Sequence, residues 1–353
     1  MGQAIVQHCS LPASLAINIL LGAASLSSSV SATATELSSC SAINEDAARL
    51  ACYDRAAGRQ APSAAEPALR TSPAPSPSES SVSTKSALSE RWELDDADKH
   101  GIFAMRAYLP TYLLPLHYTD SSNDRPSSPS HGATTPVSAD YRNTEAQFQL
   151  SFKAKIAERL LFDRADFWFG YTQQSLWQVY NKKLSAAFRE TNYEPELMLV
   201  VPTDYSLAGL RGRLFSLGVL HQSNGQADPR SRSWNRVYAQ IGLERGNFVL
   251  MLRPWWRIPE NATSDDNPDI ADYIGRGEII ALYRRGEQQW AIQLRDNFRA
   301  RDNRGSVKLT WNYPLIAGLK GYVELFSGYG ESLIDYNHRQ NTIGLGISLI
   351  EWL

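Results

Sequence analysis

The sequence predicts an all-β protein: a 12-stranded antiparallel transmembrane β-barrel with a disordered, partly helical N-terminal extension. First, apolar and polar residues alternate with period two from about residue 103 to the C-terminus. Second, no apolar run of about 18 residues follows the N-terminal segment, which excludes a helical membrane protein. Third, charged residues make up 20% of the chain, below the roughly 25% typical of soluble domains, whereas it holds 16 Tyr and 9 Trp.

The N-terminal segment, residues 1–34, is typical of a secretory signal peptide. Residues 11–30 are apolar or small and carry no charge, and Ala32-Thr33-Ala34 offers a small-x-small cleavage site. The preceding stretch departs from the usual pattern, because it holds no Lys or Arg. A buried helix of a cytosolic domain is the alternative, but the pattern favours export.

Two cysteines would remain after cleavage, Cys40 and Cys52, and an even pair in an exported chain predicts a disulfide. They lie in a periplasmic segment, residues 35–56. Within it we expect a short helix over residues 43–51 with Asn44 as its N-cap.

A lipobox is the rival interpretation of Cys40, which would then be acylated at the end of Leu37-Ser38-Ser39-Cys40. Glu36 interrupts the apolar run that such a site requires, which favours the disulfide.

Residues 57–91 are rich in Pro, Ser and Ala and hold almost no large apolar side chains. Such a segment cannot bury enough surface to fold, which predicts a flexible linker. We therefore expect the folded body, residues 92–353, to begin near Trp92.

Alternation in the body is clearest in its last segment, where every second residue from Ile343 to Leu349 is Ile or Leu. Successive strand side chains point to opposite faces, so one face is apolar and the other small or polar. Similar segments are long enough to cross a bilayer as tilted strands. We expect strands over residues 103–117, 145–157, 166–180, 193–203, 211–223, 233–244, 247–257, 271–284, 288–297, 305–314, 319–328 and 341–352.

Aromatic residues near the ends of these segments suit a membrane–water interface. A soluble β-sandwich also shows alternation, but the export signal and the number of strands favour the transmembrane barrel. The expected interfacial residues are Trp168, Trp255, Trp256, Tyr283, Trp290, Trp311, Tyr313 and Trp352.

The candidate active site lies in residues 221–236, the densest polar segment of the body. Counting by twos places His221, Ser223 and Asn235 on the apolar, lipid-facing side of two adjacent strands. A hairpin centred near Pro229 would bring Ser223 opposite Asn235 with His221 nearby. A serine needs a neighbouring base, and an imidazole base needs a third group that orients it. An ordinary polar loop at the barrel rim is the alternative, but polar groups on a lipid-facing stripe are costly and favour function.

The motif HQSNG at residues 221–225, followed by SRSWNR at 231–236, resembles outer-membrane phospholipase A. Other segments resemble the same family in the same order: YTQQS at 171–175, FRETNYEP at 188–195, DDNPDI at 265–270 and SGYGESLIDYN at 327–337. The resemblance implies a calcium-dependent barrel enzyme of the bacterial outer membrane that hydrolyses phospholipid acyl esters as a phospholipase A1/A2. It implies Ser223 as nucleophile, His221 as base and Asn235 as orienting group. Backbone N–H groups of Ser223 and Gly225 would stabilise the oxyanion.

The resemblance also implies a homodimer with calcium at its interface. The ligands would be Ser231, the main-chain carbonyl of Gln226, and Ser185 of the partner subunit. Gln226 stands where a well-known member of the family has an Arg, which a main-chain ligand tolerates. Asp228 and Asp266 match a second, weaker calcium site, and Gln173 matches a polar residue of the dimer interface.

Two other functions remain open on the sequence alone: a passive channel or structural barrel, and a lipid A deacylase with a similar Ser-His pair.

The net charge of −2 gives no global basic field that would bind nucleic acid. The partners we expect are phospholipid substrate, outer-membrane lipid and a second copy of the chain.

Overall fold

The computed structural model describes residues 40–56, 86–133, 141–316 and 318–353. The expected signal peptide and residues 57–85 of the expected linker lie outside these ranges. The chain divides into two units, residues 1–80 and 81–353.

The first unit contains helix α2 (Asp46–Ala56) and a disulfide that joins Cys40 to Cys52. The helix begins two residues after Asn44 and continues past residue 51, so it starts and ends later than the sequence predicted. Its first turn holds Asp46 and its last turn Arg55, both of which match the helix dipole.

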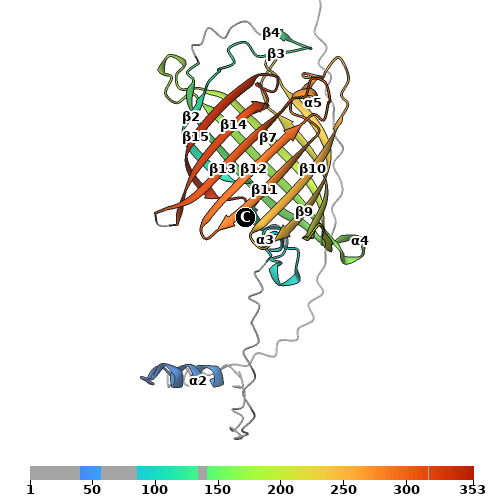
Figure 1. Cartoon of the computed structure of the whole chain (residues 1–353). Coiled ribbons are helices and arrows are strands. Elements are labelled where there is room, and N and C mark those ends of the chain that lie inside the picture. Colours follow the sequence, from blue (N-terminus) through green and yellow to red (C-terminus); the bar gives the residue numbers. More distant parts are fainter. Residues whose placement is uncertain (1–39, 57–85, 134–140, 317) are drawn as a thin grey trace, which may run out of the picture. The chain divides into compact units, whose positions relative to one another are not determined.

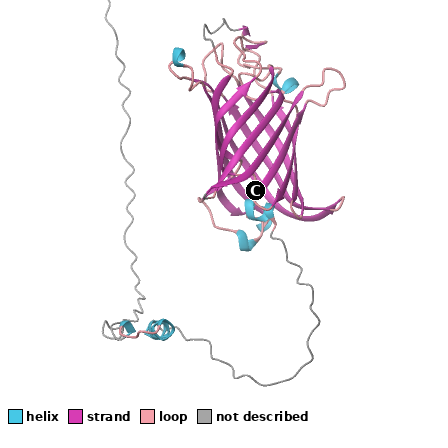
Figure 2. Ribbon diagram, turned by 60° about the vertical axis from the view of Figure 1, so that its left-hand side comes forward, coloured by secondary structure: helices cyan, strands magenta, loops and turns pink. Residues whose placement is uncertain are grey.

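The second unit is a closed antiparallel barrel of twelve strands, which confirms the predicted fold class (Figures 1 and 2). Each strand pairs with its neighbours in sequence, and the last strand pairs with the first to close the ring. The twelve are β2 (Thr111–Thr119), β5 (Thr144–Arg159), β6 (Ala165–Trp177), β7 (Phe188–Leu207), β8 (Leu210–Ser223), β9 (Ser233–Arg245), β10 (Phe248–Ile258), β11 (Gly277–Arg285), β12 (Gln288–Asp296), β13 (Gly305–Ile316), β14 (Leu319–Tyr329) and β15 (Arg339–Ile350).

Most expected strands agree with those observed to within three residues at each end, but β7 is longer at both ends than the expected 193–203. Two other expected strands are interrupted or replaced in part. The segment 103–117 is divided into a short strand β1 (Met105–Ala107), which pairs with β5, and the barrel strand β2. Pro110 lies at the break, where its missing N–H prevents continuous pairing. The segment 271–284 begins instead with helix α5 (Ile270–Tyr273) in the loop before β11.

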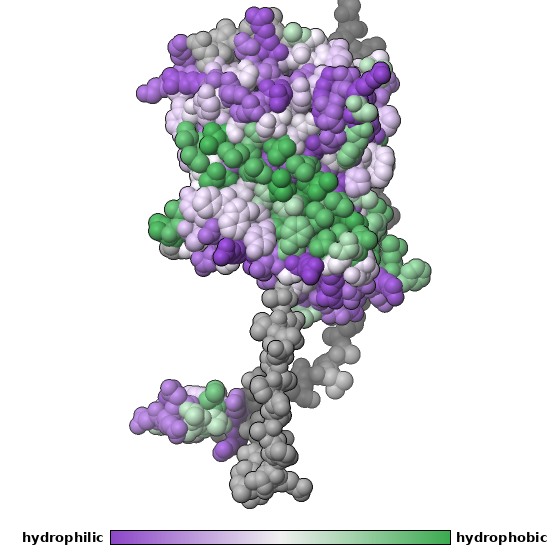
Figure 3. Space-filling view, viewed as in Figure 1, coloured by the Kyte–Doolittle hydropathy of each residue, from purple (hydrophilic) through white to green (hydrophobic). Residues whose placement is uncertain are grey.

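The two faces of the barrel have opposite chemistry. Outward residues such as Leu217 and Val219 are each 46% exposed, whereas inward polar residues such as Ser216 and Glu324 are at most 1% exposed. Figure 3 shows hydrophobic side chains gathered across the middle of the barrel, between a hydrophilic loop region and a hydrophilic lower rim. No helix among the described residues is long and apolar enough to cross a membrane.

Three of the expected interfacial aromatics face inward instead. Trp168, Trp255 and Trp352 are 0%, 5% and 8% exposed and belong to the buried cluster. They were predicted from their place near strand ends, which does not say which face a side chain occupies. Trp255 and Trp256, for example, are consecutive in β10, so only one of them can point outward. Trp256 and Tyr283, by contrast, are 61% and 48% exposed.

Helix α3 (Ala87–Trp92) packs against the barrel strands β8 and β9, although composition assigned residues 87–91 to the linker. The hydroxyl oxygen of Ser86 caps it by accepting from the backbone N–H of Ser89 at 2.9 Å. Leu88 is completely buried, and the Trp92 ring packs edge-on against Tyr108 at 5.7 Å. Two well-placed apolar side chains and a cap therefore outweigh the polar composition of the surrounding segment.

The remaining short elements lie in the loops. Figure 1 shows α3 and α4 at one end of the barrel and α5 with the hairpin of β3 and β4 at the other. They are η1 (Asp96–Asp98), β3 (Ser127–Ser128), β4 (Gly132–Ala133), α4 (Leu160–Asp163) and η2 (Lys182–Leu184).

Candidate active site

His221 and Asn235 lie opposite each other on β8 and β9, on the outer face of the barrel. His221 Nδ1 is 2.8 Å from Asn235 Oδ1. Because an amide oxygen only accepts, Nδ1 carries the proton and the other ring nitrogen, Nε2, keeps a free lone pair. This is the tautomer that an imidazole base needs.

The register differs by two residues from the sequence prediction: Ser223 lies opposite Ser233, not Asn235. Asn224 accounts for the difference, because it closes the loop between the strands with both its backbone and its side chain. Its N–H donates to the carbonyl of Arg232 at 3.0 Å, and its Oδ1 accepts from the N–H of Arg232 at 3.0 Å. The hairpin is therefore centred at Asp228 rather than Pro229.

Ser223 follows His221 on the same face of β8, two residues further along. Within the described part of the chain its hydroxyl makes no hydrogen bond to His221. Catalytic hydrogen bonds are often long without substrate and shorten when it binds, so the spacing remains compatible with nucleophile and base.

Inward-facing side chains of β8 and β9 stabilise the two strands that carry the site. Gln222 points into the barrel, where its side-chain oxygen accepts from Trp234 Nε1 at 2.7 Å and Arg236 Nη2 at 3.1 Å. Its amide donates to Glu194 at 2.7 Å. The guanidinium of Arg236 lies 3.9 Å from the Trp234 ring centroid. These contacts fix β8 against β9 directly behind His221 and Ser223.

The loop after Ser223 supplies the candidate oxyanion donors. Gly225 has a φ of +63°, a conformation that favours glycine, and a Cβ there would lie 3.3 Å from the Tyr193 ring. Glu190, which is 2% exposed, braces this loop by accepting from the side chains of Asn224 and Gln226. The brace holds the backbone N–H of Gly225 in one place.

Glu260 is a site residue that the sequence did not indicate. Its carboxylate accepts from Asn235 Nδ2 at 3.0 Å, which fixes the amide so that Oδ1 faces His221. Glu260 follows β10, whose last residue Ile258 pairs with Asn235. Burial raises the pKa of the Glu260 carboxyl, and the charge of Asp265 raises it further. Only the strand register reveals this contact, because 25 residues separate Glu260 from Asn235.

The expected calcium ligands lie in two loops at the same end of the barrel. The Ser231 hydroxyl donates to Asp266 Oδ2 at 2.6 Å, and the Gln226 side chain accepts from Arg230 at 2.7 Å. Ser185 is exposed in the loop between β6 and β7. Among the described residues of this single chain, no hydrogen bond or ion pair links Ser185 to Gln226 or Ser231.

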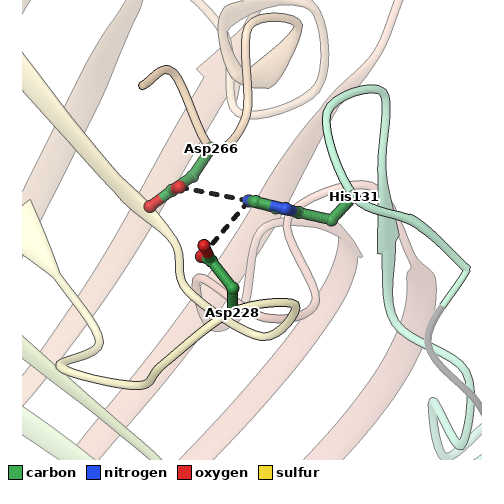
Figure 4. A group of neighbouring side chains, drawn as sticks. All are labelled: His131, Asp228 and Asp266. Carbon is green, nitrogen blue, oxygen red and sulfur yellow. Dashed lines mark hydrogen bonds and ion pairs between the residues drawn. The ribbon is translucent and has the colours of Figure 1, made fainter. Parts of the chain in front are cut away.

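Asp228 and Asp266, the expected second calcium site, face each other across a histidine that the sequence did not indicate. Figure 4 shows the His131 ring pointing between the two carboxylates. His131 Nε2 lies 3.1 Å from Asp266 Oδ1 and 3.6 Å from Asp228 Oδ1. The residue lies 97 positions before Asp228 in the hairpin of β3 and β4, so no local motif connects them.

Gln173 lies on the outer face of β6, where its amide oxygen accepts from the Tyr171 hydroxyl at 3.0 Å. The strand registers pair Gln173 with Tyr193, and Tyr193 with Ser223. The three residues therefore form one row across three neighbouring strands. At a strand spacing of about 4.8 Å, the expected interface residue lies about 10 Å along the barrel surface from the candidate nucleophile.

A closed barrel that carries serine, histidine and asparagine on its apolar outer face has the architecture of a barrel hydrolase. The family model of phospholipase A1 matches residues 88–349. The chain belongs to the phospholipase A1 family.

Three known proteins show the similarity. The chain is 39% identical over 363 residues to a putative phospholipase A1 of Neisseria meningitidis serogroup B, covering 93% of this chain and 94% of that protein. It matches the solved outer membrane phospholipase dimer of Salmonella typhi with bound calcium at a TM-score of 0.65 and 36% identity, over 72% of this chain and 95% of that one. It matches the Escherichia coli outer membrane phospholipase A with an asparagine-to-alanine substitution in its active site at a TM-score of 0.67 and 33% identity, over 76% and 100%.

Proposed function

We propose that this protein is a calcium-dependent phospholipase of the bacterial outer membrane that cleaves phospholipid acyl esters with Ser223, His221 and Asn235. One observation carries the proposal: the oriented His221–Asn235 pair lies on the outer face of the barrel beside Ser223. A lipid in the surrounding leaflet reaches this face laterally. The active-site asparagine of the E. coli relative supports the role given to Asn235.

The reaction follows from the positions of the three side chains. The Ser223 oxygen attacks the acyl carbonyl carbon while His221 Nε2 takes the hydroxyl proton. The backbone N–H groups of Ser223 and Gly225 bind the developing oxyanion. When the intermediate collapses, the ester C–O bond breaks and His221 returns the proton to the leaving glycerol oxygen. His221 then takes a proton from water, whose oxygen attacks the acyl carbon. The bond to the Ser223 oxygen breaks, His221 gives that oxygen the proton, and the fatty acid is released.

Calcium fits the residues that we expect to hold it. Ser231, the main-chain carbonyl of Gln226 and Ser185 of the partner subunit offer only oxygen, which calcium prefers. Ser231 uses its hydroxyl proton in the bond to Asp266, so its lone pairs face away from that contact and are free to ligate. When bound, the ion supplies positive charge near the oxyanion.

Dimerisation is the proposed means of activation, because a ligand from each subunit is needed to complete the calcium site. The row from Gln173 through Tyr193 to Ser223 supports an interface beside the proposed nucleophile. The Salmonella typhi relative was solved as a dimer with calcium, which supports this assignment.

Product analysis distinguishes this function from the two alternatives. Refolded protein in detergent is given phospholipid or lipid A with calcium, and the released fatty acids are identified by mass spectrometry. We expect fatty acid and lysophospholipid from phospholipid and little release from lipid A. Release from lipid A alone would indicate a deacylase. The absence of ester hydrolysis with both substrates would favour the passive channel or structural barrel. Buried polar side chains such as Gln147 and Gln240 fill the interior, which argues against a channel.

Glu260 is a positioning residue in this proposal, because it acts on His221 through Asn235. We expect Glu260→Gln to lower kcat by about tenfold and to move the acid limb of the pH–rate profile to lower pH. Its amide oxygen still accepts from Asn235, but the lost negative charge makes protonation of the imidazole less favourable. Steady-state rates of both proteins, measured from about pH 5 to about pH 9, test the expected fall in kcat and the expected shift of the acid limb.

A purely structural role for Glu260 would lower the rate without moving the acid limb. Glu351→Gln, at the opposite end of the barrel, is the matched control and should leave the profile unchanged. An identical profile for Glu260→Gln and the unsubstituted protein would contradict the role.

A further inference from the structure

A hollow of about 760 Å³ lies on the outer surface of strands β11–β14, at the end of the barrel that carries the long loops. Its floor is apolar and is formed by Ile279, Leu294 and Val307, which lie side by side on three neighbouring strands. Gly305 lies next to this floor, opposite Asp296, and adds no side chain to the outer surface. The surface is therefore recessed and apolar where the strands meet the loops.

The end of the barrel that holds the hollow faces the cell exterior. The loop there between β10 and β11 spans residues 259–276, whereas β9 and β10 are joined at the other end by a turn at residues 246–247. Outer-membrane barrels have long extracellular loops and short periplasmic turns. Figure 1 shows β11–β14 on the near side of the barrel, and Figure 3 shows hydrophobic side chains over their middle with hydrophilic ones above. The hollow therefore opens to the outer leaflet of the membrane.

Two arginines at the rim, Arg304 and Arg339, give the hollow a positive charge. Within the described ranges, neither forms an ion pair with a carboxylate. The Arg304 guanidinium lies 4.3 Å from the centroid of the Tyr273 ring, which fixes its plane and leaves the N–H groups at its edge free to bind an anion. Asp296 also lines the hollow, but its Oδ1 already accepts from the backbone N–H of Phe298 at 2.6 Å.

Phe298 is an apolar side chain at the rim that the protein itself does not cover. It is 68% exposed and has a φ of +54°, a strained conformation for a bulky residue. Strained residues of this kind cluster at ligand sites, and an exposed apolar side chain beside an apolar surface favours an apolar ligand. Acyl chains provide that cover.

We propose that the hollow binds one molecule of lipid A, the phosphorylated and acylated glycolipid of the outer leaflet. Its acyl chains lie on the apolar floor and against Phe298, and its phosphates contact Arg304 and Arg339. A planar guanidinium binds phosphate through paired N–H groups, and basic residues beside an apolar surface recognise lipid headgroups. A common phospholipid carries fewer phosphates and acyl chains than lipid A, so two arginines and a hollow that spans β11 to β14 fit the larger glycolipid.

This lipid site is separate from the candidate active site and from the expected dimer interface. The active-site residues lie on β8 and β9, and Gln173 lies on β6, which is opposite β12 in the closed ring. Bound lipid A therefore leaves both surfaces free, and the proposal does not depend on the proposed function.

Native mass spectrometry of the full-length Ser223→Ala protein in detergent, with purified lipid A and chelator, tests the site. The substitution prevents hydrolysis and the chelator prevents calcium bridges, so binding is measured separately from catalysis. We expect one lipid A per chain. Arg304→Gln and Arg339→Gln should each weaken binding about fivefold, which is the contribution of one arginine at a lipid surface.

Two further variants separate the hollow from a general attraction of charge. Arg285→Gln removes an exposed arginine at the opposite end of β11 and should leave the affinity unchanged. Ser327→Phe fills the hollow from β14 and keeps both arginines, and it should weaken binding at least about fivefold. Unchanged affinity in the arginine variants or in Ser327→Phe, or no binding of lipid A by the starting protein, would overturn the proposal. Phosphatidylglycerol that binds as tightly as lipid A and is weakened equally by the arginine variants would overturn the assignment to lipid A.

Discussion

Ser223→Ala is expected to lower phospholipid hydrolysis by at least about 1000-fold, because no other group replaces the attacking oxygen. The substitution removes one hydroxyl that makes no hydrogen bond to His221 among the described residues, so the barrel should fold as before. The measurement is fatty-acid release from mixed micelles by equal amounts of refolded protein. Electrophoretic mobility with and without heating checks the fold.

Ser233→Ala is the matched control, because Ser233 lies directly opposite Ser223 in the β8–β9 register. Both substitutions remove one hydroxyl from the same outer surface. Ser233 holds its place through its backbone N–H, which donates to Asn267 at 3.0 Å, so loss of its hydroxyl should leave most of the activity. Comparable losses in the two variants would show that the effect is not specific to a nucleophile at residue 223.

The barrel was predictable because strand alternation is a local property. Every second residue from Ile343 to Leu349 is Ile or Leu, and β15 includes that stretch. Helix α3 was not predictable in this way, because its stability comes from tertiary contacts. Leu88 and Trp92 are buried against strands that lie far along the chain, and such contacts leave no period in a Pro- and Ser-rich segment.

The candidate site was predictable to the extent that one hairpin carries it. His221, Ser223 and Asn235 lie within 15 residues, so counting by twos put them on one face. The count did not place Ser223 correctly against β9, because side-chain bonds of Asn224 set where the loop closes. Glu260 and His131 reach the site from other loops, and only the closed barrel brings those loops together.

Removal of calcium is expected to reduce hydrolysis by at least about 100-fold, which is the size of effect seen when one oxyanion donor is lost. The protein is stripped with chelator, assayed, and assayed again after calcium is restored. Activity should return with calcium and should rise more steeply than in proportion to protein concentration, because the proposed site draws Ser185 from the partner subunit. Unchanged activity in chelator would contradict the metal assignment.

Two variants locate this effect. Ser231→Ala should require more calcium for half-maximal activity, because it removes a proposed ligand. Ser264→Ala removes an exposed hydroxyl from a neighbouring loop and should not change the calcium requirement.

Gln173→Leu should weaken calcium-dependent dimerisation by about threefold to tenfold, the value of one polar contact within a membrane. Sedimentation equilibrium in detergent measures that change. A fully active Gln173→Leu monomer would refute activation by dimerisation while leaving the roles of Ser223, His221 and Asn235 intact.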